Sequence, residues 1–444
     1  MFKRKLAPLI ESVQANFWFV PSIILLLTIL MAVLTVTVDA RASVLLQEML
    51  PFIYSMNLSA ARSILATIAA SMITVTSIAF SITIVSLTMA SSQFGPRLMR
   101  NFMMDKTTQI VLGVFTSNFL YCVLVYCAIS LAPPYQIIPA TSFLWAMLMT
   151  LICLGFLIHF IHHVAKSIQA DNVVNDVYCE LKASVAKFFP RYVDDEKWRP
   201  QVPTVELKDE QYCNETALRS SRSGYVQLID TSALIEHLAK HDQRLKLAFS
   251  AGDYIPKGSI IGCLYSTDTQ AQNTASNIEK HIVLGSTRTP VQDPEFAIHQ
   301  LVEIALRALS PSINDPYTAI TCIDKLSSIL CDITTRQFPS VELKDKAGQV
   351  RIHRKALCYQ DLGSAAFDQI RQQAQSNVSV TIRLLESLQK VAMQACSEQQ
   401  YQFVRGQLEM IVEQQGKETH AKGDASDIGN RIQQIEAYLA QIPS

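Results

Sequence analysis

The stretch between Arg62 and Arg97 constrains the fold most, because it contains no charged side chain. Ile, Val, Leu and Ala dominate it, so it is apolar enough to enter a lipid bilayer. Hydroxyl side chains also recur in it at steps of three or four residues, which collects them on one face of a helix. These side chains, which we call the hydroxyl stripe, are Thr67, Ser71, Thr74, Ser77, Ser81 and, after a break, Thr88. A lipid-facing helix needs no such stripe, so we expect this face to meet protein or water.

Hydropathy predicts four membrane spans, at residues 17–38, 63–92, 108–131 and 141–164. The first apolar run is too long for the core of a typical signal peptide, so we expect a retained anchor. A helix from residue 63 to Pro96 would be about 50 Å long, against about 30 Å of hydrocarbon. Its last turns are therefore expected to project beyond the lipid and to end at Gly95-Pro96.

The basic residues that flank the spans predict the orientation. One side of the membrane would hold Lys3, Arg4, Lys5, Arg97, Arg100, Lys106 and Lys166. The other side would hold only Arg41 and Arg62, with Asp39 and Glu48 beside them. The positive-inside rule then predicts a multi-pass protein of the bacterial inner membrane with both termini in the cytoplasm.

The fold class expected from these patterns is a four-helix integral membrane domain followed by a mixed α+β cytoplasmic domain. Residues 1–16 would form a cytoplasmic N-terminus, and the membrane domain would cover 17–165. Residues 166–215 read as a helical extension and a polar linker, and residues 216–290 as a small β-rich domain. Residues 291–444 are expected to be mostly helical.

Three further groups of residues are candidate sites. Gln93, Arg97 and Arg100 would lie at the inner mouth of a pore lined by the hydroxyl stripe. His159, His162 and His163 have the helical spacing of a weak metal-binding candidate. An interfacial cluster is the favoured interpretation, because no acidic or cysteine ligand lies nearby in the sequence. Asp293, Asn314 and Asp315 belong to two Asp-Pro helix starts, where capping carboxylates argue against an anion site; Asp293 would be an N-cap with Pro294 at the first helical position.

Composition and motifs exclude several classes of function. Lys and Arg together number 38, and so do Asp and Glu together, so the formal net charge is zero. The net charge therefore gives no reason to expect a nucleic-acid partner. The ten cysteines form no C-x-x-C pair, which fits a reducing compartment. No nucleotide-binding, metalloprotease, hydrolase or kinase signature occurs, so we expect neither an enzyme nor a cofactor.

Three stretches together resemble one family. They are residues 90–100 (ASSQFGPRLMR), 223–230 (SGYVQLID) and 307–319 (RALSPSINDPYTA). This combination is similar to the bacterial predicted membrane proteins of domain-of-unknown-function family 2254. The resemblance extends from the first span to past the second Asp-Pro helix, and it implies the architecture but no reaction or substrate.

Two functions from different classes remain open. The first is a homo-oligomeric channel for small ions, embedded in membrane lipid and lined by the hydroxyl stripe. The second is a membrane-anchored sensor or scaffold whose spans only anchor a cytoplasmic domain. The stripe alone does not decide between them, since small polar residues also mediate helix packing in membranes.

Overall fold

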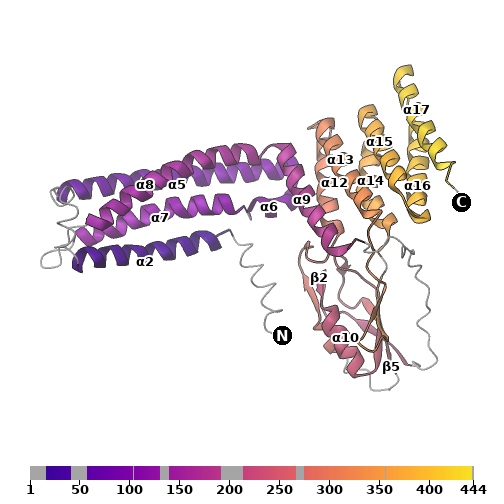
Figure 1. The fold of residues 1–444 in the computed structure, drawn as a ribbon, viewed down its shortest axis with the longest axis horizontal. Helices are drawn as coiled ribbons and strands as arrows, with labels where there is room; N and C mark the ends of the chain where they lie inside the picture. The colour runs from indigo at the N-terminus through magenta and orange to yellow at the C-terminus, as the bar shows by residue number, and fades with distance from the viewer. Residues whose placement is uncertain are drawn as a thin grey trace. The chain divides into compact units, whose positions relative to one another are not determined.

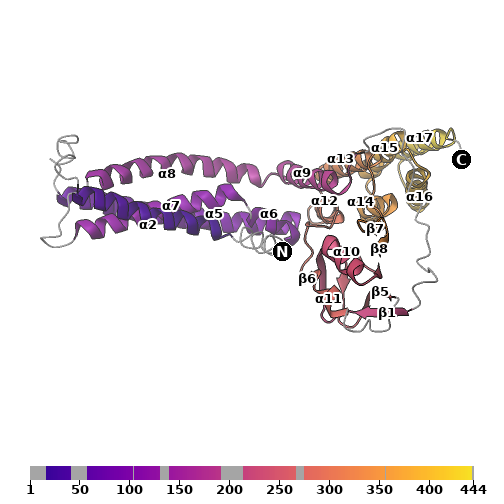
Figure 2. The same ribbon diagram turned by 60° about the horizontal axis from the view of Figure 1, so that its bottom comes forward.

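The computed structural model describes residues 17–41, 58–103, 105–130, 140–191, 214–266, 275–355 and 357–442. The predicted cytoplasmic N-terminus, residues 1–16, lies outside these ranges. The chain divides after Val173 into two compact units, each with its own core. We call them the N-terminal unit and the C-terminal unit (Figures 1 and 2).

The N-terminal unit contains four helices that are long and apolar enough to cross a membrane: α2 (Phe19–Arg41), α5 (Leu58–Phe94), α7 (Lys106–Ile129) and α8 (Ala140–Ser167). They run side by side in Figures 1 and 2. α7 packs against the other three helices, and half of its apolar window is buried, compared with 17% for α2 and α8. The prediction of four apolar helices is confirmed, and α7 is their centre.

α5 is a continuous helix of 37 residues, which corresponds to about 55 Å. It begins at Leu58, five residues before the predicted start, and ends where the sequence predicts. Gly95 has a φ of 111°, a conformation that residues with a Cβ rarely adopt. Pro96 then begins a short 3₁₀ helix, η1 (Pro96–Leu98), which leads into α6 (Met99–Met103).

Two charged side chains tie helix ends together in the N-terminal unit. Asp39, at the end of α2, is only 2% exposed and caps the start of α8. Its carboxylate accepts hydrogen bonds from the backbone N–H groups of Thr141 and Ser142, at 2.8 and 3.0 Å, and from both of their hydroxyls. Arg62 of α5 donates to the Ile129 carbonyl at the end of α7, at 2.7 Å. Both contacts satisfy backbone groups that a helix end leaves unpaired.

The C-terminal unit contains two β-sheets with a shared core. The first has strand order β1-β5-β3-β8-β7 and the second β4-β2-β6. The strands are β1 (Asn214–Arg219), β2 (Gly224–Ile229), β3 (Gln243–Leu247), β4 (Tyr254–Ile255), β5 (Ile260–Ser266), β6 (Ile282–Gly285), β7 (Glu342–Lys344) and β8 (Val350–His353). Two helices, α10 (Thr231–Lys240) and α11 (Ala275–Glu279), complete this part. Val226, Leu234, Leu245, Leu264 and Ile352 belong to one buried cluster, which joins both sheets to α10.

Six further helices of the C-terminal unit form three stacked helical hairpins. They are α12 (Glu295–Ala308), α13 (Pro316–Ile333), α14 (Tyr359–Gln373), α15 (Val378–Gln394), α16 (Glu398–Gln415) and α17 (Lys422–Leu439). α12, α14 and α16 pack in one row, and α13, α15 and α17 pack in a second (Figure 1). The mixture of strands and helices expected after the apolar helices is therefore confirmed.

The β7–β8 hairpin differs from the expected division at residue 290. β8 pairs in parallel with β3, so this hairpin enters the five-stranded sheet although it follows α13 in the chain. Arg351 of β8 is buried and holds the hairpin in place through Asp345 at 2.8 Å and Asp242 at 2.7 Å. The contact with the Arg351 guanidinium also holds the pKa of Asp345 below its ordinary value. Strand pairing over this sequence distance leaves no local pattern that would predict it.

Replacing Asp39 tests the tertiary cap between α2 and α8. Asp39→Ala leaves the first turn of α8 without its acceptor, and we expect a loss of stability of about 2 kcal/mol. The measurement is the midpoint of thermal unfolding of the purified protein in detergent. Thr37→Ala is the matched control, because this exposed hydroxyl bonds the Leu34 carbonyl of its own helix. Equal shifts in the two variants would contradict the capping role.

Candidate functional site

The hydroxyl stripe lies on the outer face of α5. Thr67, Ser71, Thr74, Ser77, Ser81 and Thr88 are all exposed in the single chain. The opposite face packs inside the N-terminal unit through Leu65, Ala69, Thr76, Ala79, Thr83 and Ala90. Packing among the described residues of this unit therefore leaves the stripe uncovered.

The stripe hydroxyls are hydrogen-bonded to their own helix. Thr67, Ser71, Thr74, Ser77 and Thr88 each donate to the carbonyl four residues earlier, at 2.8 to 2.9 Å. A hydroxyl has one proton to donate and two lone pairs that accept. Because the proton is used on the backbone, the outer face of α5 presents oxygen lone pairs.

The exposed faces of the other outer helices are different in kind. Leu26 and Leu30 of α2, and Leu151 and Ile158 of α8, are each about two-thirds exposed. Bulky aliphatic side chains of this kind suit direct contact with lipid tails. Among the described helices of this unit, α5 is the one whose exposed face carries hydroxyl groups interspersed with Ala and Ile.

The other predicted candidates around the spans do not form a compact site. Gln93 and Arg97 are exposed where α5 ends, while the side chain of Arg100 lies outside what the structure describes. His163 lies 3.5 Å from the Asp105 carboxylate, and its ring centroid is 6.1 Å from that of His159. No group of three or more His, Cys, Asp or Glu side chains in the described ranges could hold a metal ion.

The Asp-Pro helix starts have structural roles. Asp315 is the N-cap of α13 and accepts from the Thr318 backbone N–H at 3.1 Å, and Asn314 before it has a φ of 50°. Asp293 bonds the Glu295 N–H at 3.1 Å, but it is buried and its closest partner is the Arg288 guanidinium at 2.6 Å. α12 begins after Pro294, so this proline is the N-cap residue and lies outside the helix. Local sequence gave no sign of the Arg288 partner.

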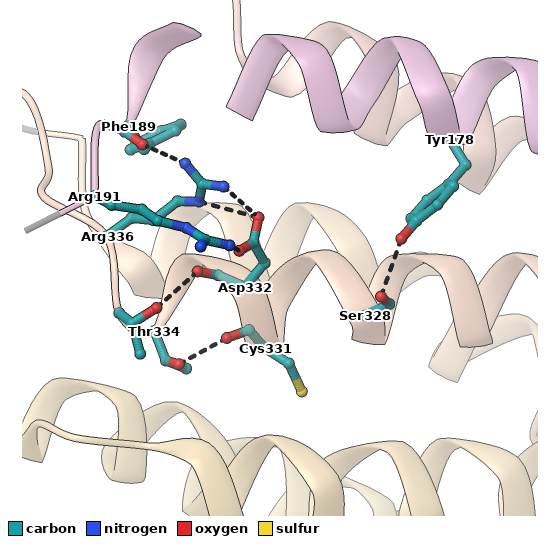
Figure 3. A network of polar contacts seen from close by, with 9 residues as sticks. Tyr178, Phe189, Arg191, Ser328, Cys331, Asp332, Thr334 and Arg336 are labelled. Atoms are coloured by element: carbon teal, nitrogen blue, oxygen red, sulfur yellow. Dashed lines mark hydrogen bonds and ion pairs between the residues drawn. The ribbon is translucent and has the colours of Figure 1, made fainter. Parts of the chain in front are cut away.

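Local sequence patterns do not predict how α9 (Ala170–Phe188) docks within the C-terminal unit. α9 follows α8 after two residues. At its far end, buried Arg336 donates to the Phe189 carbonyl at 2.9 Å and pairs with Asp332 at 2.8 Å (Figure 3). Nearer the start of α9, the Tyr178 hydroxyl lies 3.2 Å from the Ser328 hydroxyl of α13. These contacts fix residues 174–191 on α13.

A cleft of about 480 Å³ lies beside this docking surface, between α13 and α15. Both signs of charge line it, together with hydroxyl, thiol and amide groups: Asp324, Asp332, Arg383, Lys390, Ser328 and Cys331 are among its residues. Asp332 and Ser328 therefore line the cleft and also take part in the contacts that dock α9 on α13. We call it the α13–α15 cleft.

A cluster of three histidines lies in the β-rich part of the C-terminal unit. The ring of His237 in α10 is 4.9 Å from that of His241 and 6.1 Å from that of His281, between ring centroids. Burial lowers the pKa of His237, and the two neighbouring imidazoles and Lys240 lower it further. The cluster therefore favours uncharged His237 in the folded protein.

Four apolar helices joined to an α+β unit define a multi-pass membrane protein with a large C-terminal unit outside its apolar helices. The chain belongs to the DUF2254 family of predicted membrane proteins, whose model matches residues 14–390. It is 30% identical over 360 residues to the uncharacterized proteins Rv1290c of Mycobacterium tuberculosis and Mb1321c of Mycobacterium bovis. The match covers 79% of this chain and 67% of each relative. No solved structure matches the chain.

The lowered pKa of His237 predicts acid sensitivity. A folded-state pKa below the ordinary value means that the folded protein resists protonation, so this contribution to stability is complete above about pH 6.5 and is lost as the pH falls through the folded-state pKa. We expect the thermal midpoint to fall between about pH 7 and pH 5, and to fall less in His237→Gln. His420→Gln is the control, since that imidazole bonds Gln415 elsewhere in the unit. An identical pH dependence in both variants would refute the assignment.

Replacing Arg336 tests the docking of α9. Arg336→Ala leaves the Phe189 carbonyl and the Asp332 carboxylate without their shared partner, at a cost of about 2 kcal/mol. Amides in residues 174–191 that exchange only when α9 leaves α13 should then exchange about 30-fold faster. Hydrogen–deuterium exchange on the full chain measures this. Arg191→Ala is the matched control, because Arg191 is 74% exposed and lies 3.5 Å from the same carboxylate. Unchanged exchange in Arg336→Ala would show that other contacts dock α9.

Proposed function

We propose that this protein is a homo-oligomeric ion channel of the bacterial inner membrane, with the hydroxyl stripe of α5 lining the pore. The observation that supports it is the exposure of the whole stripe on the face of α5 opposite to its packing face. The remaining oxygen lone pairs of these hydroxyls have no hydrogen-bond donor in lipid, whereas in a pore they replace part of the hydration shell of an ion. Several copies with their α5 faces together would give these groups a polar surrounding.

The hydrogen bonding of the stripe bears on which ions would pass. Since the hydroxyl protons of Thr67, Ser71 and Thr74 are donated to backbone carbonyls, their free lone pairs point outward. Lone pairs attract cations. Arg97, which follows the end of α5, carries the opposite preference and would favour anions at the mouth. The hydroxyl lining would therefore favour cations, whereas Arg97 at the mouth would favour anions.

The orientation belongs to the same proposal. Basic residues cluster at one end of the spans, so both termini and the C-terminal unit would lie in the cytoplasm. In this orientation the inner mouth is at Gln93 and Arg97. The outer end is at Asp39 and Arg62, whose contacts hold the helix ends together.

A second candidate function is a membrane-anchored sensor. The docking of α9 favours it, because residues 174–191 join the C-terminal unit directly to the segment that follows α8. In this alternative the α5 faces of neighbouring copies would pack against each other, as small polar faces do in membranes, and no conduit would form.

Ionic current tests the pore. We expect the purified full-length protein to give unitary currents in planar bilayers, and Ser77→Leu to reduce them severalfold because it places a bulky apolar side chain in the middle of the stripe. Gly155→Leu is the matched control: Gly155 is exposed on α8, and a Cβ there would meet no atom within 4 Å. The reversal potential in asymmetric salt reports whether the lone pairs or Arg97 determine the selectivity.

Reagent access separates the two functions if currents are small. With native cysteines replaced, cysteines at Ser71 and Thr74 should react with hydrophilic thiol reagents, whereas cysteines at Leu30 and Leu151 should not. Protection at all four positions, together with an absence of current from an intact oligomer, would refute the pore and favour the sensor.

A further inference from the structure

The turn between α12 and α13 displays apolar side chains that packing leaves uncovered. Tyr317 is 79% exposed, more than Leu26 of the apolar helix α2 at 69%, and Ile313 is 42% exposed. We call residues 311–317 the α12–α13 tip. Its other exposed side chains are uncharged: Pro311, Ser312 and Asn314. An aromatic ring and an aliphatic chain that share an uncharged, exposed surface mark a place where another molecule or a membrane binds.

Hydrogen bonds fix the backbone of the α12–α13 tip. The N–H groups of Ile313 and Asn314 both donate to the Ser310 carbonyl, at 3.1 and 2.8 Å. The N–H group of Asp315 donates to the Ala308 carbonyl at 2.8 Å, and its carboxylate caps α13. Because these donors are already bonded, taking the tip out of water costs less free energy. A backbone that is fixed in advance also loses little conformational entropy on binding.

α9 and α13 run side by side in the same direction. Two of the contacts that show this are drawn in Figure 3, and all three join these pairs: Asn175 and Lys325, Tyr178 and Ser328, Phe189 and Arg336. The residue numbers differ by 150 in the first two pairs and by 147 in the third, so the helices keep nearly one register. From the second pair, Ala170 lies about 12 Å back along α9, and Tyr317 lies about 16 Å back along α13. The tip therefore lies level with the first turn of α9 or slightly beyond it.

The chain reaches the start of α9 directly from an apolar helix. α8 ends at Ser167 and α9 begins at Ala170, which is three Cα steps away, or at most about 11 Å. Lys166, in the last turn of α8, is exposed, and a basic residue at the end of an apolar helix is typical of a membrane surface. The tip is thus at the end of the C-terminal unit at which the chain arrives from α8.

We propose that the α12–α13 tip binds the lipid surface on the side of the membrane where α8 ends, with Ile313 and Tyr317 inserted among the lipid headgroups. Tyrosine is enriched at this depth, since its ring is apolar and its hydroxyl remains in water. The exposed side chains of the tip carry no charge, so the contact needs no anionic lipid. It would hold the C-terminal unit to the bilayer at a second point besides the chain connection. This inference does not depend on whether α5 lines a pore.

Lipid contact is measured on the full-length protein in phosphatidylcholine vesicles. Acridonylalanine, a fluorescent amino acid, is incorporated in place of Ser312, or in a second sample in place of Thr335. A lipid that carries a nitroxide on its headgroup quenches the emission only at close range. We expect quenching at residue 312 to be severalfold stronger than at residue 335. Thr335 is the matched control, because it is also exposed and follows Tyr317 by a distance of about 27 Å along α13.

Variants of the tip show which side chains make the contact. Ile313→Ser combined with Tyr317→Ser should lower the quenching at residue 312 to the level at residue 335. Tyr317→Trp should keep it, because Trp has the same amphipathic character. Met393→Ser should also keep it, since Met393 is 62% exposed on α15 and lies outside the tip. Added salt or phosphatidylglycerol should leave the quenching unchanged, because charge attraction plays no part.

Three results would overturn the lipid contact. The first is equal quenching at residues 312 and 335. The second is quenching that requires phosphatidylglycerol and is lost in salt, because charge attraction would then hold the unit to the bilayer. The third is a blue-shifted emission at residue 312 without quenching by the labelled lipid, which would show that a protein surface covers the tip. The pore is tested separately by ionic current, so failure of one proposal leaves the other standing.

Discussion

Every polar group that enters a bilayer has to find its partner within the protein, and this constraint organises the N-terminal unit. The four long helices satisfy their own backbones, and α7 is buried by the other three. The exceptions are the helix ends, where Asp39 supplies acceptors to α8 and Arg62 supplies donors to α7. The hydroxyls of α5 follow the same rule, since each bonded proton returns to a carbonyl of its own helix.

Periodicity and composition predict the parts of the structure that depend on short stretches of sequence. The apolar runs predicted four helices and Gly95-Pro96 predicted the end of α5, and the structure has both. These features arise because a helix repeats every few residues and a glycine with positive φ ends it locally. That the hydroxyl stripe meets protein or water stays a prediction.

The contacts that sequence reasoning missed join residues far apart in the chain. Asp332 and Arg336 have the spacing of a helical ion pair, but the Phe189 carbonyl that Arg336 also binds precedes it by 147 residues. In the sequence, Asp39 served only as a charged residue that flanks the first span. In the structure it caps α8, which begins about a hundred residues later. β8 entered a sheet begun before α12, so the expected boundary at residue 290 does not separate strands from helices. Long-range pairing of this kind leaves no periodic trace in one sequence.

The two candidate functions need not compete for the same residues. The stripe belongs to α5, while the cleft and the docking of α9 belong to the C-terminal unit. α9 follows α8 after two residues, and α8 packs against α5 and α7. The chain therefore passes from α8, which packs against α5, into the helix whose later residues are docked on α13. The sensor and channel proposals therefore concern different parts of one chain, and evidence for one of them does not exclude the other.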